Sequence, residues 1–233
     1  MKKETFSQKQ DRTDKIFSLL KKTYPDAGMI LRFSNPWELL VAVILSAQCT
    51  DKKVNEVTEK LFQKYRTLDA YVRAGTSTAG RKEFEHMIHS TGFYRAKAKH
   101  ILATAKLVKE NFNGKIPKTM EELLTLRGVA RKTANVVLGN AYGVVEGIAV
   151  DTHVARLSQR LELSAAHDPK KIERDLMELL PKKNWFRSTY LLIDHGRKIC
   201  TAKDPRCDLC PLQKICPSAF QFPRFEKNVK HNT

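Results

Sequence analysis

The chain has 233 residues, of which 42% are hydrophobic, so it can fold as one large domain or two small ones. Its 42 lysine and arginine residues exceed the 25 acidic residues, and the net charge of +17 indicates a polyanionic partner: DNA, RNA or an anionic membrane surface. The longest apolar run, residues 39–45, is too short to span a bilayer, and residues 1–12 lack the apolar segment of a signal peptide, so we expect a cytoplasmic protein.

The N-terminal half predicts helices, because none of its apolar patterns alternates as a strand would. Residues 1–11 are polar and are expected to fray, and residues 13–24 form an amphipathic helix. Asn35 and Pro36 are typical of a helix start, and residues 37–47 are apolar nearly all round, which predicts a helix in the core. Further amphipathic helices are expected at residues 52–65, 68–74, 83–90 and 95–112.

Two short interruptions between these helices carry side chains that could bind a partner. Gln48 lies in a polar cluster at the end of the apolar helix, where a solvated loop and a functional loop are both open. Cys49 beside it is expected to be packed rather than reactive. Phe93 follows Gly92 between two amphipathic helices, and the sequence leaves both core packing and exposure of its ring open.

The stretch over residues 126–138 predicts a helix that stops, turns through a hairpin and restarts. Thr119 and Glu122 are typical of a capping box that starts the first helix, and Gly128 is expected to end it. The apolar face of this first helix is expected to contain Leu123, Leu124 and Leu126.

A second helix is expected to start near Arg131, so the amides of Val129, Ala130 and Arg131 would point outward from a helix N-terminus, which is a site for an anion. Lys132 lies in the first turn of that helix, beside the anion site. On this segment alone, a glycine between helices is usually only a connection and Lys132 is one of 42 basic residues, so both interpretations stay open.

The C-terminal half continues as helices. A mostly apolar run over residues 147–150 leads to Asp151, which can cap the next helix and whose carboxylate could also serve an amine. Helices are expected at residues 151–161, 169–180 and 184–198, so the predicted fold class is all-α.

Four of the five cysteines lie close together near the C-terminus, with the spacing Cys200-x6-Cys207-x2-Cys210-x5-Cys216. Four thiolates are enough for a tetrahedral zinc site or an iron–sulfur cluster, and the spacing by itself does not decide between them. A disulfide pair is disfavoured in a reducing cytosol. Lys203 and Arg206 lie between the first two cysteines, in a basic loop that either contacts phosphates or is only solvated.

Residues 12–217 resemble the helix-hairpin-helix DNA glycosylases, and most closely the endonuclease III family. Residues 126–135 are similar to the family's Leu-Pro-Gly-Val-Gly-Arg-Lys-Thr-Ala-Asn, and residues 150–153 match its Val-Asp-Thr-His. The polar cluster around Gln48 and the cysteine spacing also match the family. Two positions depart from the pattern: Arg127 stands where the family has proline, and Ala130 where it has the second glycine, so a Cβ could crowd a phosphate.

The resemblance implies an all-α, two-lobed fold whose C-terminal loop holds a 4Fe-4S cluster through the four cysteines. The family arrangement would put Lys132 opposite Asp151, in the cleft between the lobes. It would divide the chain into an N-terminal helix joining the cluster lobe (1–27), a six-helix lobe with the hairpin (28–143), C-terminal helices with the cluster loop (144–220) and a flexible basic tail (221–233).

The resemblance also implies a bifunctional DNA glycosylase and abasic-site lyase of base excision repair that removes oxidised pyrimidines. Lys132 would attack the sugar of the flipped nucleotide, Asp151 would assist, and the Schiff base would permit cleavage 3′ to the abasic site by β-elimination. The DNA-binding residues would be Gln48, Phe93, Gly128, Ala130, Arg131, Lys203 and Arg206. We expect a nucleoid-associated monomer whose partner is double-stranded DNA with damaged bases or abasic sites, and not a membrane.

Two other interpretations are open. A monofunctional glycosylase for mismatched bases would share the fold and the cluster but lack the lysine, so Lys132 argues against it. A metal-stabilised hairpin module that only binds DNA would make Lys132 and Asp151 incidental. Borohydride trapping on abasic-site DNA, combined with a base-release assay, separates the three, because only the lyase forms an imine that can be reduced.

Overall fold

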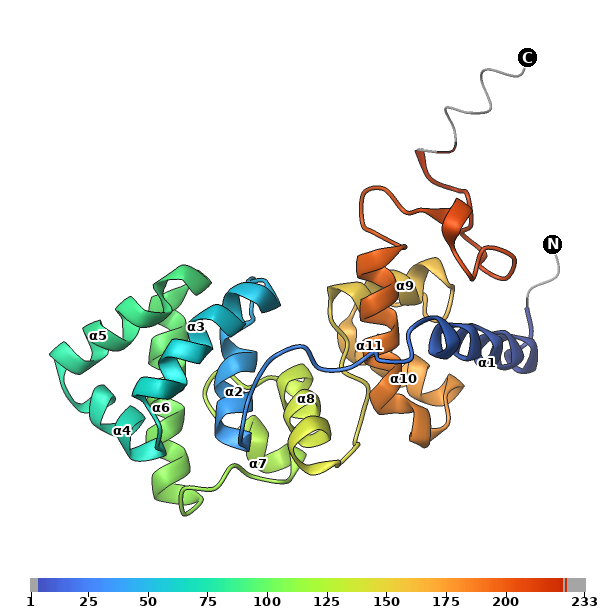
Figure 1. The fold of residues 1–233 in the computed structure, drawn as a ribbon. Coiled ribbons are helices and arrows are strands. Elements are labelled where there is room, and N and C mark those ends of the chain that lie inside the picture. The colour runs from blue at the N-terminus through green and yellow to red at the C-terminus, as the bar shows by residue number, and fades with distance from the viewer. Residues whose placement is uncertain (1–3, 224, 226–233) are drawn as a thin grey trace. The chain divides into compact units, whose positions relative to one another are not determined.

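The computed structural model describes residues 4–223 and 225, and every regular element among them is a helix (Figure 1). The all-α prediction is therefore confirmed. The chain divides into two compact units, Met1–Gly28 with Gly147–Thr233 as unit 1 and Met29–Glu146 as unit 2. Within the described part of the chain, no helix has the length and apolar character needed to cross a membrane. Of the basic tail expected over residues 221–233, only residues 221–223 and 225 are among those described.

Unit 2 is built around α2, in which every residue from Leu39 to Leu45 is buried. This helix packs against α3, α6 and α8, as its apolar character on all sides predicts. The unit holds seven α-helices, among them the short α7 that the capping box of Thr119 and Glu122 predicts. Its elements are α2 (Pro36–Leu45), α3 (Asp51–Lys64), α4 (Leu68–Thr76), α5 (Thr78–Ile88), the 3₁₀-helix η1 (His89–Thr91), α6 (Tyr94–Asn111), α7 (Met120–Leu124) and α8 (Arg131–Tyr142).

Unit 1 joins the N-terminal helix to the C-terminal helices in one hydrophobic core. Ile16, Phe17 and Leu20 of α1 are buried there with Leu157 of α9 and Leu191 of α11. Its elements are α1 (Phe6–Thr23), α9 (Thr152–Arg160), α10 (Pro169–Leu179), α11 (Lys182–Lys198) and the 3₁₀-helix η2 (Cys207–Leu209). The cysteine segment therefore begins where α11 ends.

The expectation of a frayed N-terminus is wrong from Phe6 onward, because α1 begins there. Thr5 and Gln8 form a complete capping box, in which each side chain accepts the backbone N–H of the other residue. Arg12 adds an ion pair of 2.8 Å to Glu4. The first turn of α1 is therefore helical although it has no apolar face, because side chains accept its terminal N–H groups.

Helix α5 begins at Thr78 rather than at residue 83. Ser77 caps it, since its hydroxyl accepts the Gly80 N–H at 3.0 Å. Gly80 obscures this start in the sequence, because glycine disfavours helix. In the structure a Cβ at this position would lie 2.8 Å from the Ala74 carbonyl oxygen, so the close approach of α4 requires glycine.

Candidate functional site

The hairpin between α7 and α8 is fixed to unit 2 by buried side chains and a hydrogen bond. Leu123 and Leu126 are buried, and the Thr104 hydroxyl donates to the Arg127 carbonyl at 2.9 Å. The prediction that Leu124 shares this buried face is wrong, because its side chain is 45% exposed. Successive helical residues are rotated by about 100°, so Leu123 and Leu126 face the core and Leu124 faces away from it.

Gly128 is required in the hairpin for two reasons. Its φ of +76° lies in the left-handed region, which residues with a Cβ disfavour. A Cβ there would also lie 3.0 Å from the Cβ of His100 on α6. Ala130 differs, because its φ of −100° is ordinary extended backbone. Alanine therefore stands without backbone strain where the family pattern has glycine.

Gly128→Ala is expected to lower the free energy of unfolding by more than Gly143→Ala, which serves as its matched control. Both glycines have φ near +70°, but a Cβ at Gly143 would meet nothing within 4 Å. The left-handed conformation alone costs a residue with a Cβ about 1–2 kcal/mol, and the contact with His100 adds to that loss. Urea unfolding of the two variants measures the difference, and equal losses would show that the His100 contact has no effect.

Helix α8 starts without a side-chain cap. Ala130, at the N-cap position, has no oxygen that could accept an N–H, and no acidic residue lies in the first turn. The first amides of α8 thus have no side-chain cap, and the positive end of its dipole is one at which an anion such as a phosphate could bind. Lys132, the exposed second residue of α8, adds an amine beside these amides.

Asp151 is the N-cap of α9, at the end of the buried segment from Gly147 to Val150. Its Oδ1 accepts the Val154 N–H at 2.8 Å, as the sequence predicts for a cap. The other carboxylate oxygen has no hydrogen bond partner among the described residues, and the side chain is half-buried. One oxygen thus holds the helix and the other is available for chemistry. Asp151 belongs to unit 1, whereas Lys132 belongs to unit 2.

Gln48 and Phe93 share an uncommon backbone conformation. Their φ angles are +53° and +49°, in the left-handed region that residues other than glycine rarely adopt. Gln48 is exposed between α2 and α3, and Phe93 is 67% exposed just before α6. The exposure of Phe93 rules out core packing for its ring. Exposed side chains on strained backbone are concentrated at functional loops.

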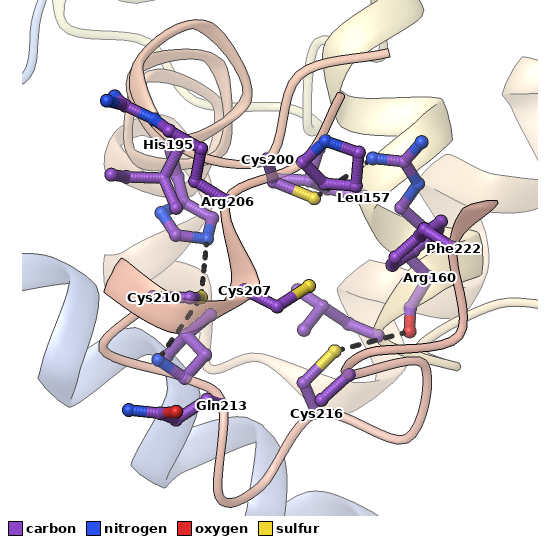
Figure 2. Close-up of a pocket in the computed structure, with 15 residues that line it drawn as sticks. Leu157, Arg160, His195, Cys200, Arg206, Cys207, Cys210, Gln213, Cys216 and Phe222 are labelled. Atoms are coloured by element: carbon purple, nitrogen blue, oxygen red, sulfur yellow. Dashed lines mark hydrogen bonds between the residues drawn. The ribbon is translucent and has the colours of Figure 1, made fainter. Parts of the chain in front are cut away.

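Four cysteine side chains surround one cavity of unit 1 (Figure 2). They are Cys200, Cys207, Cys210 and Cys216. All four are free thiols, so no disulfide closes this segment. Hydrogen-bond donors face two of the sulfur atoms: Arg160 Nη1 lies 3.2 Å from the Cys200 sulfur, and the Leu212 N–H lies 3.4 Å from the Cys210 sulfur. Such donors favour the thiolate form that binds metals.

Burial, in contrast, disfavours the thiolate form of two of these cysteines. It raises the pKa of Cys210 to about 11 and also raises the pKa of Cys216. His195, whose Nε2 lies 3.5 Å from the Cys210 sulfur, adds no positive charge at neutral pH, because burial lowers its pKa to about 4. Burial therefore opposes the thiolate form of these two cysteines, and His195 does not offset it.

The two basic residues of the loop after Cys200 differ in their contacts. Lys203 is exposed and has no partner among the described residues. The Arg206 guanidinium is also exposed, but it donates to the Lys198 carbonyl at the end of α11. Arg206 therefore helps to close the loop, whereas the ammonium of Lys203 is presented to solvent.

Known proteins resemble this chain over most of its length. The family profile described as "HhH-GPD superfamily base excision DNA repair protein" matches residues 41–182. The chain is 51% identical to the endonuclease III of Synechocystis sp., over 91% of this chain and 95% of that protein. This chain belongs to the endonuclease III family. It is also 45% identical to the endonuclease III of Bacillus subtilis, over 83% of this chain and 86% of that protein.

Solved structures agree with this assignment to the endonuclease III family. A structure described as a trapped endonuclease III–DNA covalent intermediate in an estranged-adenine complex matches with a TM-score of 0.83 and 41% identity, over 90% of this chain and 97% of that one. The resemblance inferred from the motifs is thereby confirmed. As a member of the endonuclease III family, the chain is a DNA glycosylase and abasic-site lyase of base excision repair.

Lys97 is a buried residue whose sequence context does not indicate a function. Lys97 is only 4% exposed, and its ammonium donates to the carbonyls of Leu45 and Thr91, each just before one of the two strained loops. A lysine in the first turn of an amphipathic helix usually predicts a solvated side chain. The available signal was its spacing of four residues from the buried Ile101, which puts Lys97 on the apolar face of α6.

Proposed function

We propose that this enzyme removes oxidised pyrimidines from double-stranded DNA and then cleaves the strand 3′ to the abasic site by β-elimination. The observation that carries the proposal is Lys132, an exposed amine beside helix amides that lack a side-chain cap. This arrangement offers a phosphate site and a nucleophile together. A relative 41% identical to this chain forms a trapped covalent intermediate with DNA, which supports a covalent route.

Lys132 would act as the nucleophile after the damaged nucleotide has been flipped out of the stack. Its neutral Nζ would attack C1′ of the sugar, and the bond from C1′ to the base would break, so that the base leaves with the electron pair. Loss of a proton from the nitrogen and opening of the C1′–O4′ bond would give a protonated imine. Removal of a C2′ proton would then break the C3′–O bond, which cleaves the strand.

Asp151 would assist this substitution through its free carboxylate oxygen. Positive charge develops on the sugar as the base departs, and a fixed carboxylate stabilises that charge without reorganisation. The bond from the Val154 N–H to Oδ1 keeps the carboxylate in one orientation. The same carboxylate could accept the proton that Lys132 loses.

The DNA would be held by backbone contacts and by the two exposed loop side chains. Gly128, Ala130 and Arg131 would bind a phosphate through their amides, at and just before the start of α8, which has no side-chain cap. Gln48 has both a donor and an acceptor, so it could pair with an orphaned base of any type. Phe93 would stack in the duplex, where a base–aromatic contact is worth about 1–3 kcal/mol. One chain fills all these roles, so we infer that a monomer acts at each lesion.

The four thiols that surround one cavity are the ligand set of an iron–sulfur cluster, and the family to which the chain belongs binds such clusters. We therefore propose a 4Fe-4S cluster on Cys200, Cys207, Cys210 and Cys216. When bound, it would cross-link the end of α11, η2 and the segment that follows through iron–thiolate bonds.

The purified protein is expected to contain iron and acid-labile sulfide in equal amounts, because a 4Fe-4S cluster has equal numbers of both. Replacing any one of the four cysteines by serine is expected to lower the iron content and the yield of folded protein. Cys49→Ser is the control, because Cys49 does not line the cavity. One zinc ion and no sulfide in protein made under iron-replete, anaerobic conditions would contradict the cluster.

Lys203→Ala is expected to make DNA binding less dependent on salt. Each phosphate neutralised contributes about 0.9 log unit of affinity per log unit of salt, so losing one contact should lower the slope by about that amount. Arg206→Ala is expected to do the same and, because it also removes the bond to the Lys198 carbonyl, to loosen the loop. Lys106→Ala, an equal charge change at an exposed site on α6, is the control. A slope unchanged by both loop variants would show that this loop does not contact DNA.

A duplex with a single oxidised pyrimidine tests the proposed function as a whole. The expected result is release of the damaged base together with strand cleavage on its 3′ side. Base release without cleavage would indicate a monofunctional glycosylase, and binding without either reaction would indicate a DNA-binding module. A duplex with an oxidised purine at the same position tests the lesion class, and faster excision of the purine would contradict it.

A further inference from the structure

Lys97 is buried at a position where several effects disfavour a positive charge. It is only 4% exposed, and it forms no ion pair with an acidic side chain among the described residues. It also lies in the first turn of α6, where the positive end of the helix dipole disfavours an ammonium. Burial lowers the pKa of Lys97, although the Cys49 thiol acts in the opposite direction. A buried charge is retained only where specific partners compensate it.

The partners of Lys97 are two backbone carbonyls at the ends of helices. Its Nζ donates to the Leu45 carbonyl at 2.8 Å and to the Thr91 carbonyl at 2.8 Å. Leu45 is the last residue of α2, and Thr91 is the last residue of η1. Carbonyls at helix ends have no partner within the helix, and the C-terminal end of α2 carries partial negative charge. The ammonium therefore satisfies two buried acceptors that belong to separate segments.

Both segments lead directly into the strained loops. Gln48 is the third residue after Leu45, and Phe93 is the second residue after Thr91. Both loop residues have left-handed φ angles, which persist only when the surrounding structure holds them. A single side chain thus fixes the points from which both loops depart, and all of these residues belong to unit 2.

We propose that Lys97 is a positioning residue, which holds the loops of Gln48 and Phe93 at the spacing at which both side chains enter the gap left by a flipped base. This inference rests on the gap-filling roles in the proposed function. Lys97 does not touch DNA itself, since its ammonium is buried and bonded to backbone carbonyls. Its effect is therefore confined to steps in which a base must be extruded.

The test compares two rates in each variant: excision of a paired lesion, and cleavage at a pre-formed abasic site, where little has to be extruded. Lys97→Met keeps most of the side-chain stem and removes the N–H donors. We expect the ratio of excision to abasic-site cleavage to fall roughly tenfold or more, as the loss of one stacking contact would cause. Lys106→Met, at an exposed position on the same helix, is the control and is expected to leave both rates unchanged.

A second background separates positioning from a general structural role. In a protein that already carries Gln48→Ala and Phe93→Ala, Lys97→Met is expected to lower the ratio no further, because residues that act as a unit are not additive. A further fall in that background, or an equal fall of both rates in the single variant, would overturn the inference. Lys97→Gln covers the case in which the methionine variant does not fold. Its side chain is one atom shorter than that of lysine, so it is expected to lose at least one of the two carbonyl bonds and to lower the ratio as well. A wild-type ratio in a glutamine variant would show that the two bonds are not both needed and would also overturn the inference.

Failure of the proposed function gives a different result. If Gln48→Ala and Phe93→Ala leave the ratio unchanged in an otherwise wild-type chain, the gap-filling roles are wrong, and the inference about Lys97 falls with them. If those two variants lower the ratio and Lys97→Met does not, only the inference is overturned.

Discussion

Lys132→Gln is expected to abolish both strand cleavage and the covalent adduct that borohydride traps on abasic-site DNA. Glutamine has no basic amine, so no imine can form with the sugar. Lys132 is exposed on α8, and a surface substitution of this kind should change the free energy of unfolding by no more than about 0.5 kcal/mol. Gel analysis after borohydride reduction measures the adduct, and a binding assay on the same DNA shows whether the site is intact.

The control for this prediction is Lys106→Gln, because Lys106 is an exposed lysine of the same unit. It is expected to trap and cleave as the wild type does. Undiminished trapping by Lys132→Gln would show that another amine, such as the N-terminus, is the nucleophile. Loss of DNA binding together with the adduct would instead indicate that Lys132 acts through a phosphate contact.

Asp151→Asn is expected to slow base excision by about 10²-fold or more, because it removes the charge that offsets the developing positive charge on the sugar. Loss of an N-cap costs about 1 kcal/mol of stability, but asparagine caps a helix nearly as well as aspartate. The bond from the Val154 N–H can therefore be kept while the charge is removed. Single-turnover excision rates, measured beside urea unfolding curves, separate the two roles of this residue.

Asp168→Asn is a matched control for Asp151→Asn. Asp168 caps α10 through the same oxygen atom, which accepts the N–H groups of Lys170 and Lys171 at 3.1 and 3.0 Å. Both substitutions should change stability by similar small amounts, but only Asp151→Asn should slow excision. If Asp151→Asn excised the base at the wild-type rate, Asp151 would act only as a helix cap and not in catalysis.

Most helices of this fold could be predicted from local patterns, because caps and apolar faces are local signals. Asn35 and Pro36 indicate the start of α2, and Asp168 indicates the start of α10, as the structure shows. Two helix starts were predicted too late, and both errors have local causes. The first turn of α1 lacks an apolar face, so its sequence does not indicate a helix. In α5, Gly80 suggests a loop, but the structure requires glycine there because Ala74 approaches closely.

Parts of the candidate site could be predicted from the spacing of residues in the sequence. The cysteine spacing predicts one metal-binding loop, and the four thiols do line one cavity. The left-handed backbone at Gln48 and Phe93 carries no such signal, because neither residue type favours that conformation. The role of Lys97 could not be predicted from the sequence either, because its two acceptors, the carbonyls of Leu45 and Thr91, come from separate segments of the chain.

The most direct test of the account is to identify the residue that bonds to the DNA. The wild-type enzyme is reacted with an abasic-site duplex, reduced with borohydride and digested with a protease, and the modified peptide is sequenced by mass spectrometry. The account predicts that the sugar remnant is attached to Lys132. A remnant on any other amine, or an enzyme that cleaves the strand without forming an adduct, would contradict it.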